Sequence, residues 1–272
     1  MFSEKTDAIL IRQTDFSETS RVVTFFTREH GKLGMMAKGG RRRRNPFDDS
    51  LDLLAESSIV FLKKASGSLQ LLTEASLKNR FRPEAATMQP LYAGYYIAEL
   101  LDGLSEEADP NPELYDAAAV ALRRLEKPGS KPLRILARFE TQMLRQLGHF
   151  PSLDSCLKCG RKIASGQAVV HWVSQGGLLC DDCRSDAFRQ DDIHADTLSL
   201  LRHLADTDEA SLASVQVTER QVREVRQILD SAVAYLLERR PRMLRYLQQS
   251  GERGGGRQQR AVTASGTSGR SG

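Results

Sequence analysis

The sequence predicts an α+β multidomain protein: an N-terminal five-stranded OB-fold barrel, then an α-helical domain with an inserted four-cysteine zinc ribbon. Three observations favour this fold class. Residues 1–80 contain five short runs typical of β-strands, apolar residues recur with a helical period from about residue 88, and the four cysteines form two C-x2-C pairs. A chain of 272 residues is long enough for such domains to bury a core.

The predicted barrel occupies residues 1–80. Its strands, rich in β-branched and aromatic residues or alternating in polarity, are expected at 6–13, 21–27, 32–37, 51–63 and 68–77. Regularly spaced short strands indicate a small closed barrel, because closure removes exposed strand edges. An OB-type barrel fits five strands best, and an SH3-like barrel is the alternative.

The predicted helical domain occupies residues 81–250. Leu91, Tyr95, Ala98, Leu101 and Leu104 lie on one face of a first helix, and a second follows at about 114–125. A third helix, at about 132–147, has a proline near its first turn and a glycine as its expected C-cap at 148. Further helices are expected at 195–206 and 219–240, with Pro241 interrupting the last.

The four cysteines predict one structural zinc ion. The pairs are Cys156 with Cys159 and Cys180 with Cys183, each a C-x2-C knuckle that lets two thiolates reach one tetrahedral Zn²⁺. A predicted strand at 168–173 and a Gly-Gly turn at 176–177 complete a zinc module over 153–188. Two redox dithiols or two disulfides are the alternatives. A closed site of four thiolates has no open coordination position, so we expect it to stabilise structure.

The basic residues cluster near the N-terminus and predict a polyanionic partner. The net charge is +4, yet residues 28–44 contain seven basic side chains and one acidic one. We predict that the loop between the third and fourth strands binds DNA phosphates through Lys38, Arg41, Arg42, Arg43 and Arg44, and that its two glycines, at 39 and 40, let the backbone approach. Arg12, Arg21 and Lys32 are predicted to supplement this contact. A solvated charge run is the alternative.

Aromatic side chains are candidates for stacking on bases. Phe16, Phe25, Phe26 and Phe47 lie in or beside the predicted strands. Core packing is favoured for any one of them, and we expect Phe47, on the loop after the arginines, to be the most exposed. Phe25 and Phe26 are adjacent, so one is predicted in the core and the other could be exposed. We expect most of the helical face formed by Tyr92, Tyr95, Tyr96, Leu100 and Leu101 to be core. Part of it could remain open as a groove for a partner peptide, with arginines at 123, 124, 134 and 138 nearby in sequence for acidic groups. Solvated arginines on amphipathic helices are the alternative.

The remaining features favour a binding protein over an enzyme. The five histidines show no metal-binding spacing, and the sequence contains no P-loop, dinucleotide fingerprint or G-x-S-x-G elbow. The sequence has no apolar run long enough to cross a membrane and no secretory signal pattern, so we expect a cytoplasmic protein. Residues 251–272 are rich in Gly, Ser, Thr and Arg and are predicted to be disordered.

Two sets of motifs resemble the bacterial RecO family. Near the N-terminus these are KTDAIL (5–10), DFSETSRVVTFFT (15–27) and HGKL (30–33). Ahead of the zinc module they are FE (139–140), LGHFP (147–151) and CLKCG (156–160). The resemblance covers residues 1–245, and the segment from 251 onward matches nothing in the family pattern.

The resemblance implies a mediator of DNA repair and homologous recombination. Such proteins bind single- and double-stranded DNA and anneal complementary strands. With RecR, and often RecF, they help load RecA onto DNA coated by single-strand-binding protein, whose acidic C-terminal tail they contact. Among the alternatives from other classes are a protein–protein adaptor and an RNA-binding factor.

Overall fold

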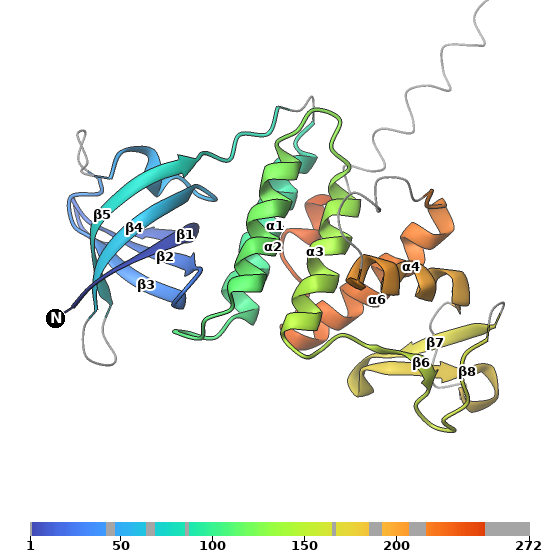
Figure 1. Cartoon of the computed structure of the whole chain (residues 1–272). Helices are drawn as coiled ribbons and strands as arrows, with labels where there is room; N and C mark the ends of the chain where they lie inside the picture. Colours follow the sequence, from blue (N-terminus) through green and yellow to red (C-terminus); the bar gives the residue numbers. More distant parts are fainter. Residues whose placement is uncertain are drawn as a thin grey trace, which may run out of the picture.

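The computed structural model describes residues 2–41, 47–63, 69–84, 87–164, 167–184, 192–206 and 216–247. Figure 1 shows a β-barrel at one end, a central group of helices and a small β-sheet at the other end. The predicted tail at 251–272 lies outside the described residues.

The barrel contains the five predicted strands and confirms the OB-type expectation. The strands are β1 (Phe2–Asp15), β2 (Arg21–Thr27), β3 (Gly31–Ala37), β4 (Glu56–Lys63) and β5 (Gln70–Asn79), with a 3-10 turn, η1 (Asp48–Leu51), before β4. They close in the order β1-β2-β3-β5-β4, and β3 pairs in parallel with β5. A simple meander would pair only consecutive strands, so this connectivity is that of a Greek-key OB-type barrel.

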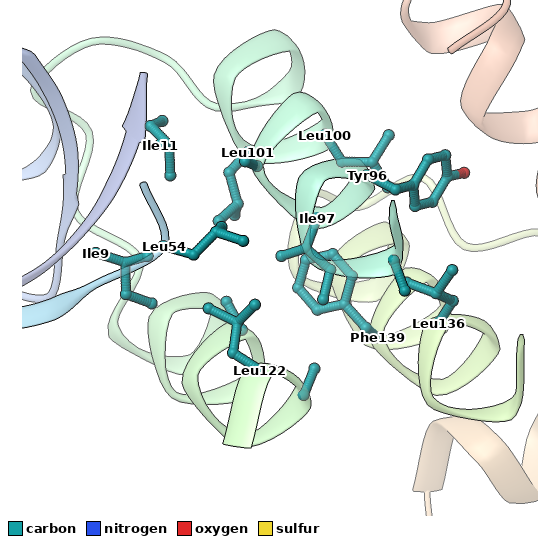
Figure 2. Packing of buried hydrophobic residues seen from close by; sticks show 14 of the residues in the cluster. Ile9, Ile11, Leu54, Tyr96, Ile97, Leu100, Leu101, Leu122, Leu136 and Phe139 are labelled. Carbon is teal, nitrogen blue, oxygen red and sulfur yellow. The ribbon is translucent and has the colours of Figure 1, made fainter. Parts of the chain in front are cut away.

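The middle of the long strand β1, at residues 8–11, is buried on both faces. Ala8 and Leu10 point into the barrel core, whereas Ile9 and Ile11 belong to the core shared with the helices. Because successive side chains of a strand point to opposite sides, this double burial explains the continuous apolar run in the sequence. Figure 2 shows Ile9, Ile11 and Leu54 facing side chains of the central helices.

The central helices are α1 (Gln89–Leu104), α2 (Pro112–Leu125), α3 (Pro132–Gln146), α4 (Ala195–Asp206) and α6 (Glu219–Leu236). Sequence capping signals set several of their ends. The Asn111 side chain accepts the backbone N–H of Leu114 at the start of α2, and Thr218 with Gln221 forms a capping box on α6. Gly148 ends α3 with a φ of 73° in a Schellman turn, in which the His149 N–H donates to the Leu144 carbonyl.

Helix α6 ends earlier than predicted, at Leu236 rather than near residue 240. Glu238 adopts a positive φ of 55°, which turns the chain away from the helix axis. Glu99 on α1 then accepts the backbone N–H groups of Arg242 and Met243 and a guanidinium N–H of Arg239. A tertiary contact with α1 therefore replaces the last helical turn.

The module that carries the cysteines contains the predicted hairpin and two further strands. β6 (Ser152–Cys156), β7 (Ala168–Trp172), β8 (Gly177–Cys180) and β9 (Ile193–His194) form one sheet in the order β6-β8-β7-β9, with 3-10 turns η2 (Val173–Gln175) and η3 (Asp181–Cys183). We call it the four-cysteine module. Gly176, with a φ of 63°, makes the turn between β7 and β8. Across the described part of the chain, no helix combines the length and apolarity needed to cross a membrane.

Candidate nucleic-acid interface and metal centre

One end of the barrel brings together the β1–β2 turn (16–20) and the start of the basic loop after β3. The backbone N–H of Arg41 donates to the Thr19 carbonyl at 3.1 Å, and its guanidinium donates to the Ser17 carbonyl at 2.6 Å. These bonds hold the loop against the turn. We call this surface, formed by residues 16–21 and 38–41, the barrel-end surface.

Asp15 links two of the predicted basic residues. One carboxylate oxygen accepts Arg21 Nε at 3.0 Å, and the other lies 3.3 Å from Arg41 Nε. Arg21 is the cross-strand partner of Asp15 and also reaches Gln13, two residues earlier on the same face. One carboxylate faces two guanidinium groups. With the exposed Lys38 and Glu18 included, three basic side chains stand against two acidic ones, so a small positive excess remains.

The basic residues predicted to bind DNA do not all lie on the barrel-end surface. Arg12 lies 3.5 Å from the Asp102 carboxylate, and Lys32 donates to the Asp102 backbone carbonyl at 2.6 Å. Both therefore face α1 rather than the barrel-end surface. Arg42, Arg43 and Arg44 lie outside the described residues.

The two glycines of the loop are buried, contrary to the predicted approach of their backbone to phosphate. Gly39 has a φ of 80°, which starts the turn after β3. A Cβ at Gly40 would lie 2.9 Å from Leu51 Cδ1 and 3.3 Å from the Ala37 carbonyl oxygen, so an alanine there would have to displace the end of the Leu51 side chain.

The structure corrects the expectation about stacking aromatics. Phe47 is 2% exposed and packs in the barrel core with Leu51. Phe25 and Phe26 are both buried, Phe25 in the barrel and Phe26 against α2, since the helices cover the outer face that was expected to be free. Phe16 is 66% exposed in the β1–β2 turn. Its sequence signal was an aromatic residue in an otherwise polar turn.

The four cysteines form one cluster. Their sulfur atoms all lie within 4.8 Å of one another, and Cys159 Sγ is 3.8 Å from Cys180 Sγ. All four are free, which argues against the disulfide alternative. Four sulfurs around a tetrahedral ion with metal–sulfur bonds of about 2.3 Å are separated by about 3.8 Å, so the donor set fits one such ion.

Backbone geometry shapes each knuckle of the cluster. Gly160 N–H donates to the Cys156 carbonyl at 2.8 Å, and Arg184 N–H donates to the Cys180 carbonyl at 3.1 Å. Burial opposes ionisation of Cys156, but backbone N–H groups directed at its sulfur lower the pKa to about 6. Hydrogen bonding from neighbouring sulfurs raises the pKa of Cys183 to about 12. A divalent cation would allow all four thiolates to ionise together.

Most of the aromatic face of α1 is core, as expected, rather than a groove for a peptide. Tyr96, Leu100 and Leu101 are fully buried, and Tyr92 packs against Tyr246 with ring centroids 5.3 Å apart. A different pocket, of about 330 Å³, lies between α3, α4 and α6. Its apolar lining includes Leu133, Leu200, Leu204, Val217 and Val222, and its basic side chains are Arg124, Lys131, Arg134, Arg138 and Arg226. We call it the basic-rimmed pocket.

Of the four arginines that the sequence suggested for acidic groups, Arg124, Arg134 and Arg138 line this pocket, whereas Arg123 pairs with Glu56. The α4 and α6 side of the pocket was not predicted. Ion pairs hold the Arg226 side chain in place: it pairs with the fully buried Glu140 and with Asp230. The Tyr96 hydroxyl also donates a hydrogen bond to Glu140 at 2.5 Å. Burial raises the pKa of Glu140 against the opposing effect of Arg226. Leu200 and Val222 are far from Arg124, Arg134 and Arg138 in sequence, so only chain folding brings them together.

Two protein-family models match adjacent parts of this chain. The model described as "Recombination protein O N terminal" matches residues 1–81, and "Recombination protein O C terminal" matches residues 86–245. The chain belongs to the RecO family. The boundary between the two matches falls between β5 and α1.

Several curated relatives carry the name "DNA repair protein RecO". The protein of Rhodopirellula baltica is 39% identical over 203 residues, which cover 74% of this RecO-family chain and 75% of the relative. That of Bacillus pumilus is 32% identical over 83% of the chain and 86% of the relative. That of Anaeromyxobacter dehalogenans is 30% identical over 93% and 98%.

Proposed function

We propose that this chain acts in DNA repair and homologous recombination as a mediator that binds single- and double-stranded DNA and anneals complementary strands. Membership of the RecO family supports the repair role. The observation that carries the DNA-binding step is the barrel-end surface, where the exposed Phe16 lies beside the basic residues Arg21, Lys38 and Arg41.

OB-type barrels bind oligonucleotides with the face of their second and third strands and with the loop between the first and second. Here that loop is the Phe16 turn, fixed by Arg41. Arginine and lysine side chains would neutralise phosphates, and Phe16 would stack on an unpaired base. The sequence places three more arginines, at 42–44, directly after Arg41.

Annealing by such a surface requires no bond to be made or broken, so we propose that the protein is not an enzyme. Phosphate neutralisation lets two polyanionic strands approach, and contacts directed mainly at the backbone leave base edges free to pair. In this scheme the protein works in the cytoplasm with RecR and RecF and helps load RecA onto DNA coated by single-strand-binding protein.

Replacing Arg41–Arg44 with alanine should weaken binding of single-stranded DNA. The slope of log Kd against log salt should fall by about 0.7 for each lost phosphate contact. Phe16→Ala should cost about 1–3 kcal/mol in affinity with little change in that slope, because stacking releases no counterions. Fluorescence anisotropy over a salt series measures both effects. Lys162→Ala, an exposed change in the four-cysteine module, is the control, and unchanged affinity of the arginine variant at moderate salt would refute the proposal.

The basic-rimmed pocket has the chemistry to receive the acidic C-terminal tail of single-strand-binding protein. Apolar side chains such as Leu133 and Val222 would hold an apolar terminal residue, and Arg134 and Lys131 would pair with carboxylates. Arg134→Glu should reduce the affinity for the tail peptide about tenfold or more by isothermal titration calorimetry, and Leu133→Asp should do the same. Lys162→Glu should leave the affinity unchanged. If all three variants bind the tail peptide with equal affinity, the tail binds elsewhere on the protein.

For the cysteine cluster, we propose one structural Zn²⁺. Cys156, Cys159, Cys180 and Cys183 would hold the ion, which would supply cross-links between the two knuckles and no reactive position.

A further inference from the structure

A second pocket, also of about 330 Å³, lies where the four-cysteine module meets helix α6. Its walls come from the connection between α3 and β6, the β7–β8 hairpin and the last turns of α6, and η2 of the hairpin contacts α6 directly. Figure 1 shows the small sheet with β7 next to these helices. This pocket is separate from both the barrel-end surface and the cysteine cluster.

His171 on β7 is the buried polar group of this pocket. It is 2% exposed, and neither of its ring nitrogens has a hydrogen-bond partner among the residues that the structure describes. Its neighbours Val170 and Trp172 pack around the cysteines, so by strand alternation His171 points to the opposite side, toward α6. Buried polar groups are nearly always paired, so this imidazole needs a partner.

The lining of the pocket selects an uncharged ligand. None of the residues that form it is an aspartate, glutamate, lysine or arginine. Burial lowers the pKa of His171 to about 4, so at neutral pH its ring carries one N–H donor and one acceptor nitrogen. Ser174 and Gln175 add polar groups at the mouth.

Flat ring surfaces lie beside these polar groups. Tyr235 of α6 is 54% exposed, and Phe150 and His149 line the pocket from the α3–β6 connection. An exposed aromatic ring next to a buried hydrogen-bonding group suits a planar ligand that has polar edges and apolar faces.

We propose that this pocket takes an unpaired base of single-stranded DNA, with the base edge hydrogen-bonded to His171 and its ring stacked on the aromatic rim. The inference rests on the proposed DNA-binding function. A base is planar and uncharged and carries both hydrogen-bond donors and acceptors. The charged phosphates of the strand would stay outside the uncharged lining of the pocket. A base within a duplex has its edge paired and its faces stacked, so the pocket would favour single strands.

The test compares a thymidine oligonucleotide with an abasic strand of equal length by fluorescence anisotropy on the full chain. The wild type should bind the base-containing strand about tenfold more tightly than His171→Phe does, with equal affinities of the two proteins for the abasic strand. Tyr235→Ala, at an exposed position, should reproduce the loss without affecting folding. Trp172→Phe, on the opposite face of β7, is the matched control and should keep wild-type binding.

The outcomes separate this inference from the proposed function. If neither strand binds, DNA binding itself is wrong. If both strands bind and both pocket variants match the wild type, only the base pocket is wrong, and an ordered water or a protein segment pairs with His171. Titrating thymidine into wild-type protein while following the His171 imidazole by NMR gives a second reading: a saturable shift is expected, and no shift would overturn the proposal.

Discussion

Among single residues, Glu224 shows how one buried carboxylate joins two helices. From α6 it accepts the His194 N–H at 2.9 Å, the Thr197 hydroxyl at 2.6 Å and Arg220 Nη1 at 2.9 Å. His194 and Thr197 flank the start of α4, so the carboxylate also faces the positive end of that helix. Burial alone would raise the pKa of Glu224, but these donors lower it to about 2.

Glu224→Gln should therefore destabilise the protein in a pH-dependent way. The folded-state pKa of Glu224 lies below its ordinary value of 4.5, so its stabilisation is complete above that pH and is lost as pH falls toward 2. At pH 7 the variant should lose about 3 kcal/mol in the free energy of unfolding. Urea unfolding from pH 7 down to 3 should show the difference from wild type shrinking below pH 4.5. Glu219→Gln, exposed at the start of α6, is the control, and a difference that grows at low pH would contradict the assignment.

Among the structural elements, the four-cysteine module has a small core of its own around Cys156, Val170, Leu179 and Cys180. So few apolar side chains contribute little hydrophobic stabilisation, and metal ligation would supply the remainder. The second face of the sheet, with Leu153, Val169 and Leu178, packs into a larger core shared with α4 and α6.

Cys156→Ser should remove bound zinc and destabilise the module, because binding to a structural site is coupled to folding. Elemental analysis should give about one zinc per wild-type chain and far less in the variant. Thermal unfolding followed by the fluorescence of Trp172, which packs around the cysteines, should shift to lower temperature. Ser152→Ala, exposed at the start of β6, should keep both wild-type values. Disulfides in the purified wild type, with no stoichiometric zinc, would overturn the assignment.

Across the whole molecule, barrel and helices share one hydrophobic core. Ile9, Ile11 and Leu54 of the barrel join Leu101 of α1 and Leu122 of α2, as Figure 2 shows. Ion pairs surround this contact: Arg28 binds both carboxylate oxygens of Asp116, and Arg123 lies 2.9 Å from Glu56. The barrel is therefore fixed to α1 and α2 by a shared core and by ion pairs.

Leu101→Ala should lower the free energy of unfolding by about 2–5 kcal/mol, because a buried side chain is lost and a cavity remains. Since the barrel and the helices share this core, the strand and helix contributions to the circular dichroism spectrum should disappear together in one unfolding transition. Met88→Ala, exposed just before α1, should change stability by less than about 0.5 kcal/mol. Two separate transitions in the wild type would show that barrel and helices unfold independently.

Features that depend on residues close together in the sequence were predicted correctly, whereas features that depend on distant residues were not. The strands and helices arise from periodicity within a few residues, and the knuckles arise from ligand spacing, so both were predictable. The exposure of Phe16 and the burial of Phe47 were not, because exposure depends on distant segments that cover a side chain. The basic-rimmed pocket was partly predictable: Arg124, Arg134 and Arg138 lie within one stretch of chain, whereas Leu200, Val222 and Arg226 come from two later helices.

Short-range pattern alone was enough to predict the order of the barrel strands and of the helices, the OB-type barrel, the cysteine cluster and the local excess of positive charge, but not the strands β6 and β9. These depend on composition and spacing, which the chain carries without folding. Folding was needed to show that Arg21 and Arg41 share Asp15 while Arg12 and Lys32 face α1. It was needed equally to bury His171 against α6 without a partner among the described residues. The partners of a side chain in a barrel or between helices come from segments far away in sequence, and its burial depends on all of them at once.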